Sequence, residues 1–300
     1  MPICLTGRVT ELWLRHDRRD LPPVVHAIPS FHSIAGSFDM PERSPVVLIS
    51  GGGTGVGAAA ARLFAARGWS VAINYRTRVE EAEAVAQDCR AQGVRAVTVM
   101  GDVSADADCR RMVDVTVRQF GRLDALVNSA GVTQFTKLSS LDEQNAEDFH
   151  RVFATNAVGA YQLARAAGPH LRAAGNSAIV SVSSIAAMNG NGSSLAYIAS
   201  KGALNSLTLA LARLYAPSIR VNAVLPGLID TGWFAPAFDS TAWDAMKGSF
   251  AEASALGTIC SAEDVAAGVL FLVADAPRMT GQLLVIDAGY SLGSAVKLSK

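Results

Sequence analysis

Short apolar runs rich in β-branched residues recur along the chain from about residue 45. Runs of this kind are typical of buried strands, and they cover residues 46–49, 70–76, 94–100, 123–127, 179–182, 219–224 and 283–286. Apolar residues at helical spacing lie between them and predict helices over about 57–68, 79–92, 104–120, 142–171, 197–214 and 262–274. Strands that alternate with helices predict a parallel sheet with helices on both faces. Since crossovers are right-handed, we expect a Rossmann-type, doubly wound α/β fold in a single domain.

The first part of the chain, residues 1–44, does not share this alternation. It lacks the apolar core of a secretory signal, and its acidic residues argue against a transit peptide. We therefore expect a mobile N-terminal extension, with Met40 as an alternative start. The predicted domain spans residues 45–293, and residues 294–300 form a C-terminal tail.

Composition and charge narrow the class of protein. Half of the residues are apolar, 17% are charged, and the formal net charge is zero. This composition is typical of a globular protein with ample core, and it gives no support for nucleic acid or a membrane surface as partner. No apolar run is long enough to span a membrane. The four cysteines are scattered and the histidines form no ligand pattern, so we expect reduced thiols in a cytoplasmic protein, and no metal.

A glycine-rich turn follows the first strand and opens the first helix. Residues 50–57 read SGGGTGVG. Glycines let the backbone approach a pyrophosphate, and the helix N-terminus offers free N–H groups with a partial positive charge. A merely flexible turn is the alternative. The order strand, glycine turn, helix predicts dinucleotide binding.

The end of the second strand bears on the choice of dinucleotide. An enzyme that prefers NAD generally ends this strand with a carboxylate for the ribose 2′-hydroxyl. Here Asn74 is neutral, and Arg76 and Arg78 follow. Arginine can pair with a 2′-phosphate, so we expect NADP(H) to be preferred over NAD(H). The alternative is that both arginines are ordinary surface charges.

Residues 179–201 hold the candidate chemistry. An apolar strand there ends in small polar residues, and Tyr197 and Lys201 follow four positions apart, on one face of a helix. A cation held at ~4 Å in an effective dielectric of ~20 favours a phenolate by ~4 kcal/mol. We therefore expect Lys201 to bring the pKa of Tyr197 down towards neutrality, unless the two share a helix face by chance.

This segment resembles the active site of the short-chain dehydrogenase/reductase family. Ser184 lies thirteen residues before Tyr197 in the motif Tyr-x-x-x-Lys, and Ser183 is the alternative if the register slips by one. The resemblance covers residues 45–293 and is closest to the 3-oxoacyl-(acyl-carrier-protein) reductase branch. It implies a catalytic tetrad of Asn156, Ser184, Tyr197 and Lys201.

Further motifs extend the resemblance to the cofactor site. Asp102-Val103 resembles the pair that flanks the adenine, residues 128–131 (NSAG) resemble the turn that steadies the sheet, and residues 226–231 resemble the loop that covers the nicotinamide. Residues 287–289 resemble the family's Asp-Gly-Gly, with alanine replacing one glycine. The implied cofactor-binding residues are Gly51, Thr54, Gly55, Val56, Gly57, Asn74, Tyr75, Arg76, Asp102, Val103, Asn128, Ala130, Gly131, Tyr197, Lys201, Pro226, Gly227, Ile229 and Thr231.

Reversible hydride transfer between NADP(H) and a carbonyl or secondary alcohol is the function that the resemblance implies. A 3-oxoacyl thioester or similar ketone is the first expectation for the substrate. A sugar or polyol dehydrogenase is the alternative, and a cofactor-binding regulator without turnover is a remote one. Residues 232–257 are rich in aromatics and are read either as a lid over an apolar substrate or as ordinary packing. A helix over 204–214 that is apolar on more than one side predicts a homo-oligomer, a dimer or tetramer.

Overall fold

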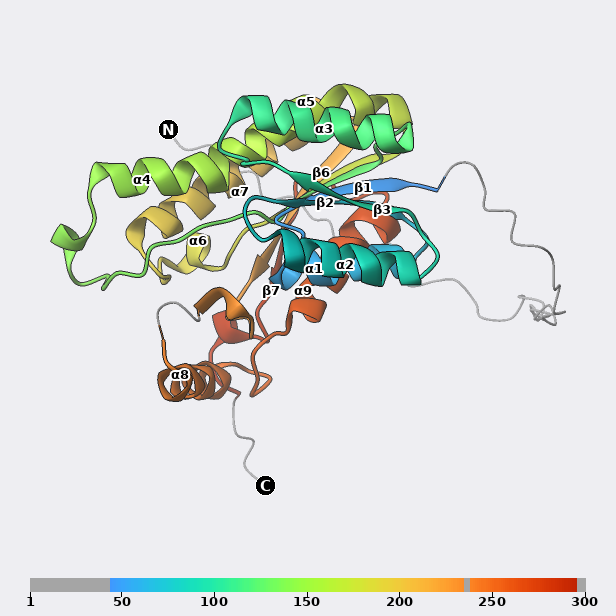
Figure 1. Cartoon of the computed structure of the whole chain (residues 1–300). Coiled ribbons are helices and arrows are strands. Elements are labelled where there is room, and N and C mark those ends of the chain that lie inside the picture. The colour runs from blue at the N-terminus through green and yellow to red at the C-terminus, as the bar shows by residue number, and fades with distance from the viewer. Residues whose placement is uncertain (1–43, 235–237, 296–300) are drawn as a thin grey trace, which may run out of the picture. The chain divides into compact units, whose positions relative to one another are not determined.

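Seven parallel strands form one sheet in this computed structural model, which describes residues 44–234 and 238–295 (Figure 1). The strands run in the order β3-β2-β1-β4-β5-β6-β7. They are β1 (Val46–Ser50), β2 (Ser70–Tyr75), β3 (Ala96–Met100), β4 (Ala125–Asn128), β5 (Ser177–Val182), β6 (Ile219–Pro226) and β7 (Leu283–Ile286). Each neighbouring pair is parallel, which confirms the predicted doubly wound fold. The predicted mobile extension lies outside the described residues.

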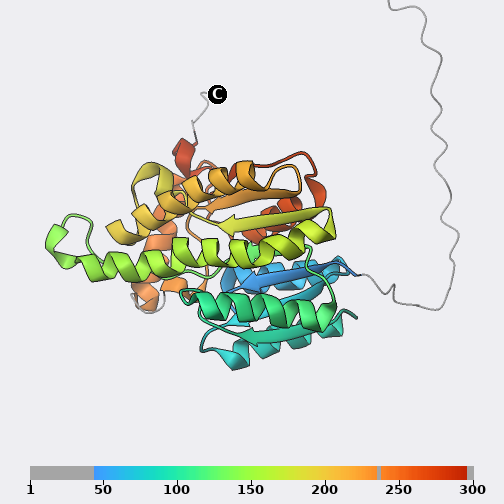
Figure 2. The same ribbon diagram turned by 90° about the horizontal axis from the view of Figure 1, so that it is seen from above.

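Helices cover the sheet on both faces. One face carries α1 (Gly55–Ala66), α2 (Val79–Ala91) and α9 (Ala262–Leu270). The other carries α3 (Asp106–Phe120), α5 (Ala160–Ala174) and α7 (Leu195–Tyr215), which run side by side across the sheet in Figure 2. The shorter elements are η1 (Leu141–Glu143), α4 (Ala146–Phe153), η2 (Ala154–Gly159), α6 (Ala186–Asn189), η3 (Gly232–Phe234), α8 (Ser240–Ala253), η4 (Phe271–Asp275) and η5 (Tyr290–Leu292).

The alternation of side chains along the central strands builds two cores. In β1, Val47 and Ile49 pack with the α1 side, whereas Val46 and Leu48 pack with the α3 side. All four are fully buried, and each such side chain contributes roughly 1.5–3 kcal/mol by leaving water. A strand buried on both faces therefore reads as a continuous apolar run, and this is why sequence alone located the strands. No helix in the described part of the chain is long and apolar enough to cross a membrane.

The helix predicted over 142–171 is wrong as a single element. The capping box of Asn145 and Asp148 starts α4 only at residue 146, because the Asn145 side chain satisfies a backbone N–H that would otherwise lack a partner. Residues 154–159 then form a π-helical turn before α5 begins. Such turns insert an extra residue into a helix and are frequent at functional sites.

Helix α7 keeps an apolar side that the described residues leave uncovered. Leu204 and Leu211 are buried as predicted, but Leu214 is 72% exposed, whereas the next residue, Tyr215, packs against the core. Leu209 is 44% exposed as well. The second apolar side of this helix is therefore present, and the subunit expected to cover it stays a prediction.

A turn with strained backbone follows β7. Ala288 has φ 54° and Gly289 has φ 79°, and left-handed backbone disfavours every residue with a Cβ. Asp287 holds the turn, since its carboxylate accepts from the backbone N–H of Gly289 at 2.9 Å and of Ser291 at 2.8 Å. The alanine that replaces a family glycine thus occupies a position where glycine is favoured.

We predict that Ala288→Gly stabilises the protein by about 1 kcal/mol. A residue with a Cβ costs roughly 1–2 kcal/mol in the left-handed conformation, and the greater entropy of glycine in the unfolded chain offsets part of what is relieved. The measurement is chemical denaturation. Gly289→Ala is the matched control and should destabilise, since its Cβ would stand 2.7 Å from that of Ala255. A lower midpoint for Ala288→Gly would contradict the strain.

Candidate active site

A cavity of about 620 Å³ lies at the carboxyl ends of the strands. Ligands of doubly wound folds bind at this edge of the sheet. Of the residues predicted for the site, those that line this cavity are Gly51, Thr54, Gly55, Val56, Asn74, Tyr75, Arg76, Asp102, Val103, Ala130, Gly131, Ser184, Tyr197, Lys201, Pro226, Gly227, Ile229 and Thr231. Gly57, Asn128 and Asn156 do not line it.

The glycine turn between β1 and α1 is shaped for a close backbone approach. A Cβ on Gly57 would stand 2.3 Å from the carbonyl oxygen of Gly51, so only glycine fits there. Gly51 and Gly55 have φ 62° and 52°, which favours glycine at both. The Thr54 side chain makes no capping hydrogen bond and no acidic residue occupies the first turn of α1. The positive N-terminal end of this helix therefore faces the cavity without an intrinsic anion.

Two polar side chains hold this turn to its neighbours. The Asn74 side-chain oxygen accepts from the Gly51 N–H at 3.1 Å, and its amide group donates to the carbonyl oxygens of Val99 and Gly101 at 3.1 and 3.0 Å. Ser50 Oγ accepts from the backbone N–H groups of Ser129 and Ala130, both at 3.2 Å. Asn74 is 2% exposed, so its side chain positions the turn and has no free donor for a ligand.

The cationic end of the cavity lies where β2 and β3 end. Arg76 is 3.5 Å from the carboxylate of Asp102, and 58% of its side chain is exposed. An exposed pair of this kind is worth roughly 0.2–1 kcal/mol, so Arg76 can turn to another anion at little cost. Hydrogen bonds from Ser104 and the charge of Arg76 outweigh burial, and hold the pKa of Asp102 below its ordinary value.

Asn156 lies in the π-helical turn and fastens two segments together. Its side-chain oxygen accepts from the Val132 N–H at 2.8 Å, and its amide group donates to the Val132 carbonyl at 3.0 Å and to Ser200 Oγ at 2.9 Å. Ser200 Oγ in turn donates to the Tyr197 carbonyl at 2.8 Å. The asparagine thus joins the turn after β4 to the first turns of α7. Its predicted part in a proton relay stays a prediction.

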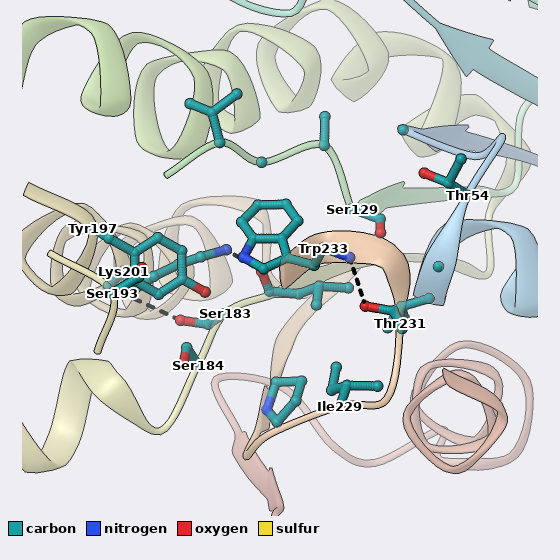
Figure 3. Close-up of a pocket in the computed structure, with 18 of the residues that line it drawn as sticks. Thr54, Ser129, Ser183, Ser184, Ser193, Tyr197, Lys201, Ile229, Thr231 and Trp233 are labelled. Atoms are coloured by element: carbon teal, nitrogen blue, oxygen red, sulfur yellow. Dashed lines mark hydrogen bonds between the residues drawn. The ribbon is translucent and has the colours of Figure 1, made fainter. Parts of the chain in front are cut away.

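The two adjacent serines at the end of β5 have different surroundings. Ser183 is 3% exposed, and its hydroxyl lies 2.6 Å from the side-chain oxygen of Asn205 and 3.3 Å from the Lys201 carbonyl. Ser184 is less buried, and its hydroxyl accepts from the Ala186 N–H at 3.1 Å. Ser184 is also the side chain that lowers the pKa of the Tyr197 phenol. Both serines line the cavity below the ring of Tyr197 (Figure 3), and the choice of Ser184 as the catalytic serine stays a prediction.

Tyr197 and Lys201 lie together, but their electrostatics differ from the sequence expectation. Helix α7 begins at Leu195, because Ser194 caps it by accepting from the Tyr197 N–H at 3.1 Å. Lys201 Nζ donates to the Val182 carbonyl at 2.7 Å and lies 5.5 Å from the centre of the Tyr197 ring. Burial raises the pKa of Tyr197 to about 12, and the hydrogen bond to Ser184 lowers it only in part. Burial also lowers the pKa of Lys201 to about 8.

The predicted lowering of the Tyr197 pKa by Lys201 is therefore wrong in this structure. The reasoning from helical spacing assumed an ammonium ~4 Å from the phenol in a partly solvated setting. Here the ammonium is turned to a strand carbonyl, and loss of water opposes charge on both groups. Desolvation thus dominates the titration of each residue.

Several lining residues carry no signal that sequence reasoning used. Asn191, Ser193 and Tyr290 line the cavity beside Met246 and Phe250 of α8. Tyr290 follows the strained turn after β7, and only the folded chain brings it to the ring of Phe250, at 4.7 Å between ring centres. No group of three or more metal-ligating side chains occurs among residues 44–234 and 238–295.

Trp233 occupies the middle of the cavity between its two ends (Figure 3). Its ring centre is 6.4 Å from that of Tyr197. Its indole Cη2 lies 3.5 Å from the point where a Cβ on Gly131 would stand, and Lys201 Nζ lies 3.9 Å from the same point. The indole therefore borders the reacting groups directly, which places part of the predicted lid segment inside the site.

The protein has a Rossmann-type fold in which a tyrosine, a serine and a lysine line the same cavity as a glycine-rich turn. A family model described as enoyl-(acyl carrier protein) reductase matches residues 51–291. The chain belongs to the short-chain dehydrogenase/reductase family, as its motifs predicted, and membership implies a nicotinamide dinucleotide as cofactor.

Similar proteins agree with this assignment. One is named as ketoacyl reductase 2 of the granaticin polyketide synthase of Streptomyces violaceoruber; it is 39% identical over 254 residues, covering 85% of this chain and 98% of that protein. Another is the cis-4-hydroxycyclohexanecarboxylate dehydrogenase of Sinomonas cyclohexanicum, 36% identical over 248 residues, covering 82% and 96%. A crystal structure assigned to this family, from Burkholderia xenovorans, has TM-score 0.78 and 40% identity and covers 83% and 99%.

We predict that Lys201 makes the stability of the protein depend on pH. Because its folded pKa of about 8 lies below its ordinary value of 10.5, the unfolded chain binds more protons between these two values. Stability therefore rises with pH through that window, by about 3 kcal/mol if the whole shift is expressed. Denaturation of wild type and Lys201→Met at pH 7 and pH 10 tests this. The free energy of unfolding of the wild type should rise relative to that of the variant at the higher pH. A difference between the two proteins that does not change with pH would contradict the prediction.

Proposed function

We propose that the protein is an NADP(H)-dependent oxidoreductase that interconverts a carbonyl and a secondary alcohol. The observation that carries this is that Ser184, Tyr197 and Lys201 line the same cavity as the glycine turn before α1. The first substrate class is a 3-oxoacyl thioester or a similar ketone. Its support is the likeness to a ketoacyl reductase and to a family described by an acyl carrier protein substrate.

The residues present fit a dinucleotide. The close approach of Gly57 to Gly51 leaves room for a pyrophosphate at the open N-terminus of α1. We assign the phosphates to residues 51–57, the adenine to Asp102 and Val103, and the nicotinamide to Lys201 and residues 226–231. When bound, the dinucleotide supplies a hydride to the carbonyl carbon or accepts one from the alcohol.

The chain's own residues handle the proton. In reduction, Tyr197 donates its phenolic proton to the carbonyl oxygen, and its raised pKa keeps that proton available at neutral pH. Ser184 donates a hydrogen bond to the same oxygen and stabilises the charge that develops there. Lys201 orients the ribose, and Asn156 supports a water that returns the proton.

We further propose that the domain of residues 45–293 acts as a cytoplasmic homo-oligomer. Exposed Leu209 and Leu214 on α7 support a second copy as the partner of that helix, because large apolar side chains gain free energy when they leave water. The segment 232–257 is proposed to cover the substrate, since Trp233, Met246 and Phe250 line the cavity.

Cofactor choice is tested at Arg76. We predict that Arg76→Asp weakens NADPH binding by roughly 10–100-fold, as expected when a charge-assisted hydrogen bond worth ~1.5–3 kcal/mol is lost. NADH binding should change only a few-fold. Fluorescence titration measures both. Arg62→Asp reverses an exposed charge on α1, outside the cavity, and is the control. Equal affinities of the wild type for NADPH and NADH would contradict the preference.

The reaction itself is tested at Tyr197. We predict that Tyr197→Phe lowers the rate of NADPH oxidation with a ketone by at least ~10²-fold, the lower range for general acid catalysis. NADPH affinity should stay within a few-fold, because the ring still packs. Tyr215→Phe removes a phenol from the other end of α7, where it bonds the Ala164 carbonyl, and should keep its turnover. A Tyr197→Phe enzyme close to wild type would show that the proton comes from another group.

A further inference from the structure

The cavity continues past Tyr197 into a part that we call the substrate arm. Its described walls come from the loop after α6, from η3, from α8 and from η5. The side chains that matter here are Asn191, Ser193, Trp233, Met246, Phe250 and Tyr290. Phe250 and Tyr290 stack with their ring planes 17° apart, so they give the arm a flat apolar wall.

Four charged side chains of the described residues line the cavity, and three of them stand at its other end, away from the arm. Among the described lining residues these are Arg76, Arg78, Asp102 and Lys201. The first three stand at the ends of β2 and β3, and Lys201 is engaged with the Val182 carbonyl. Lys247 lies on α8 near the arm, but its ammonium is bound by Asp230 at 3.4 Å and Asp244 at 3.0 Å and does not line the cavity.

The polar groups of the arm are largely occupied by one another. Ser193 Oγ lies 2.5 Å from Thr133 Oγ1, and the Ser193 carbonyl accepts from the Thr136 N–H at 3.0 Å. The Asn191 amide group donates to the Tyr290 hydroxyl at 3.5 Å. Among residues 44–234 and 238–295, a ligand that enters the arm meets aromatic and thioether surface, and the lining cation beside Tyr197, Lys201, already donates to the Val182 carbonyl.

We propose that the substrate is an uncharged, apolar ketone whose hydrocarbon body rests on the wall formed by Phe250 and Tyr290. This rests on the proposed function and narrows it. A carboxylate carried into the arm would lose water without gaining a free cation among the described lining residues, and this disfavours its binding. The chain thus differs from its relative named for hydroxycyclohexanecarboxylate, whose substrate bears that charge.

A matched pair of ring ketones tests the charge alone. The probes are 4-oxocyclohexanecarboxylate and its methyl ester, which differ in the ionised group. Binding of each to the NADPH-loaded protein is measured by calorimetry, and reduction by NADPH oxidation. We expect the ester to bind at least about tenfold more tightly and to show a correspondingly higher kcat/KM, a difference of ~1.4 kcal/mol. A carboxylate that binds as well as the ester, or an ester that does not bind, would overturn the proposal.

A second test uses a variant that places a cation in the arm. Met246→Arg should raise the affinity for the carboxylate relative to the ester by roughly tenfold, as a charge-assisted pair allows. Ala245→Arg puts the same charge on the exposed side of α8 and should leave the ratio unchanged. An unchanged ratio in Met246→Arg would also count against the proposal. An ester that binds but is not reduced would sink the proposed function while leaving the preference for uncharged ligands intact.

Discussion

The buried ammonium of Lys201 is the interaction on which the rest of the site depends. It donates to the carbonyl of Val182 at the end of β5, so it ties α7 to the sheet where that strand stops. It is 5% exposed, and no carboxylate lies within ion-pair distance of it among the described residues. A cation kept in this way costs stability, and the fold retains it one helical turn from Tyr197. A buried cation kept at such a cost is typical of a functional site.

The strands and the motif residues could be predicted because their signals are local. A strand buried on both faces is a run of apolar residues, and Tyr197 and Lys201 share a helix face because residues four apart always do. The break in the helix over 142–171 could not be predicted, since it depends on the cap by Asn145 and on the contacts that Asn156 makes with Val132. The Tyr197 pKa was misjudged for a related reason. The direction in which this pKa shifts depends on how deeply the tertiary structure buries Tyr197 and Lys201.

The two ends of the cavity differ in their charged and aromatic side chains, and this difference follows from the topology. Arginines and an aspartate stand at the ends of β2 and β3, on the side of the sheet next to β1 and its glycine turn. Aromatic residues come from segments after β6 and β7, which only the folded chain brings to the other end. Trp233 lies between the two halves beside Gly131. Sequence motifs predicted many of the residues that line the first half, whereas they carried little information about the second.

The most direct test of this account is to follow the hydride. The protein is mixed with an uncharged ketone and with NADPH in which both hydrogens at C4 of the nicotinamide are replaced by deuterium, and the alcohol formed is analysed by mass spectrometry. The account predicts an alcohol that carries deuterium on the former carbonyl carbon, formed by the wild type and lost in Tyr197→Phe. An alcohol without the label, or tight cofactor binding with no alcohol from any ketone that binds, would contradict it.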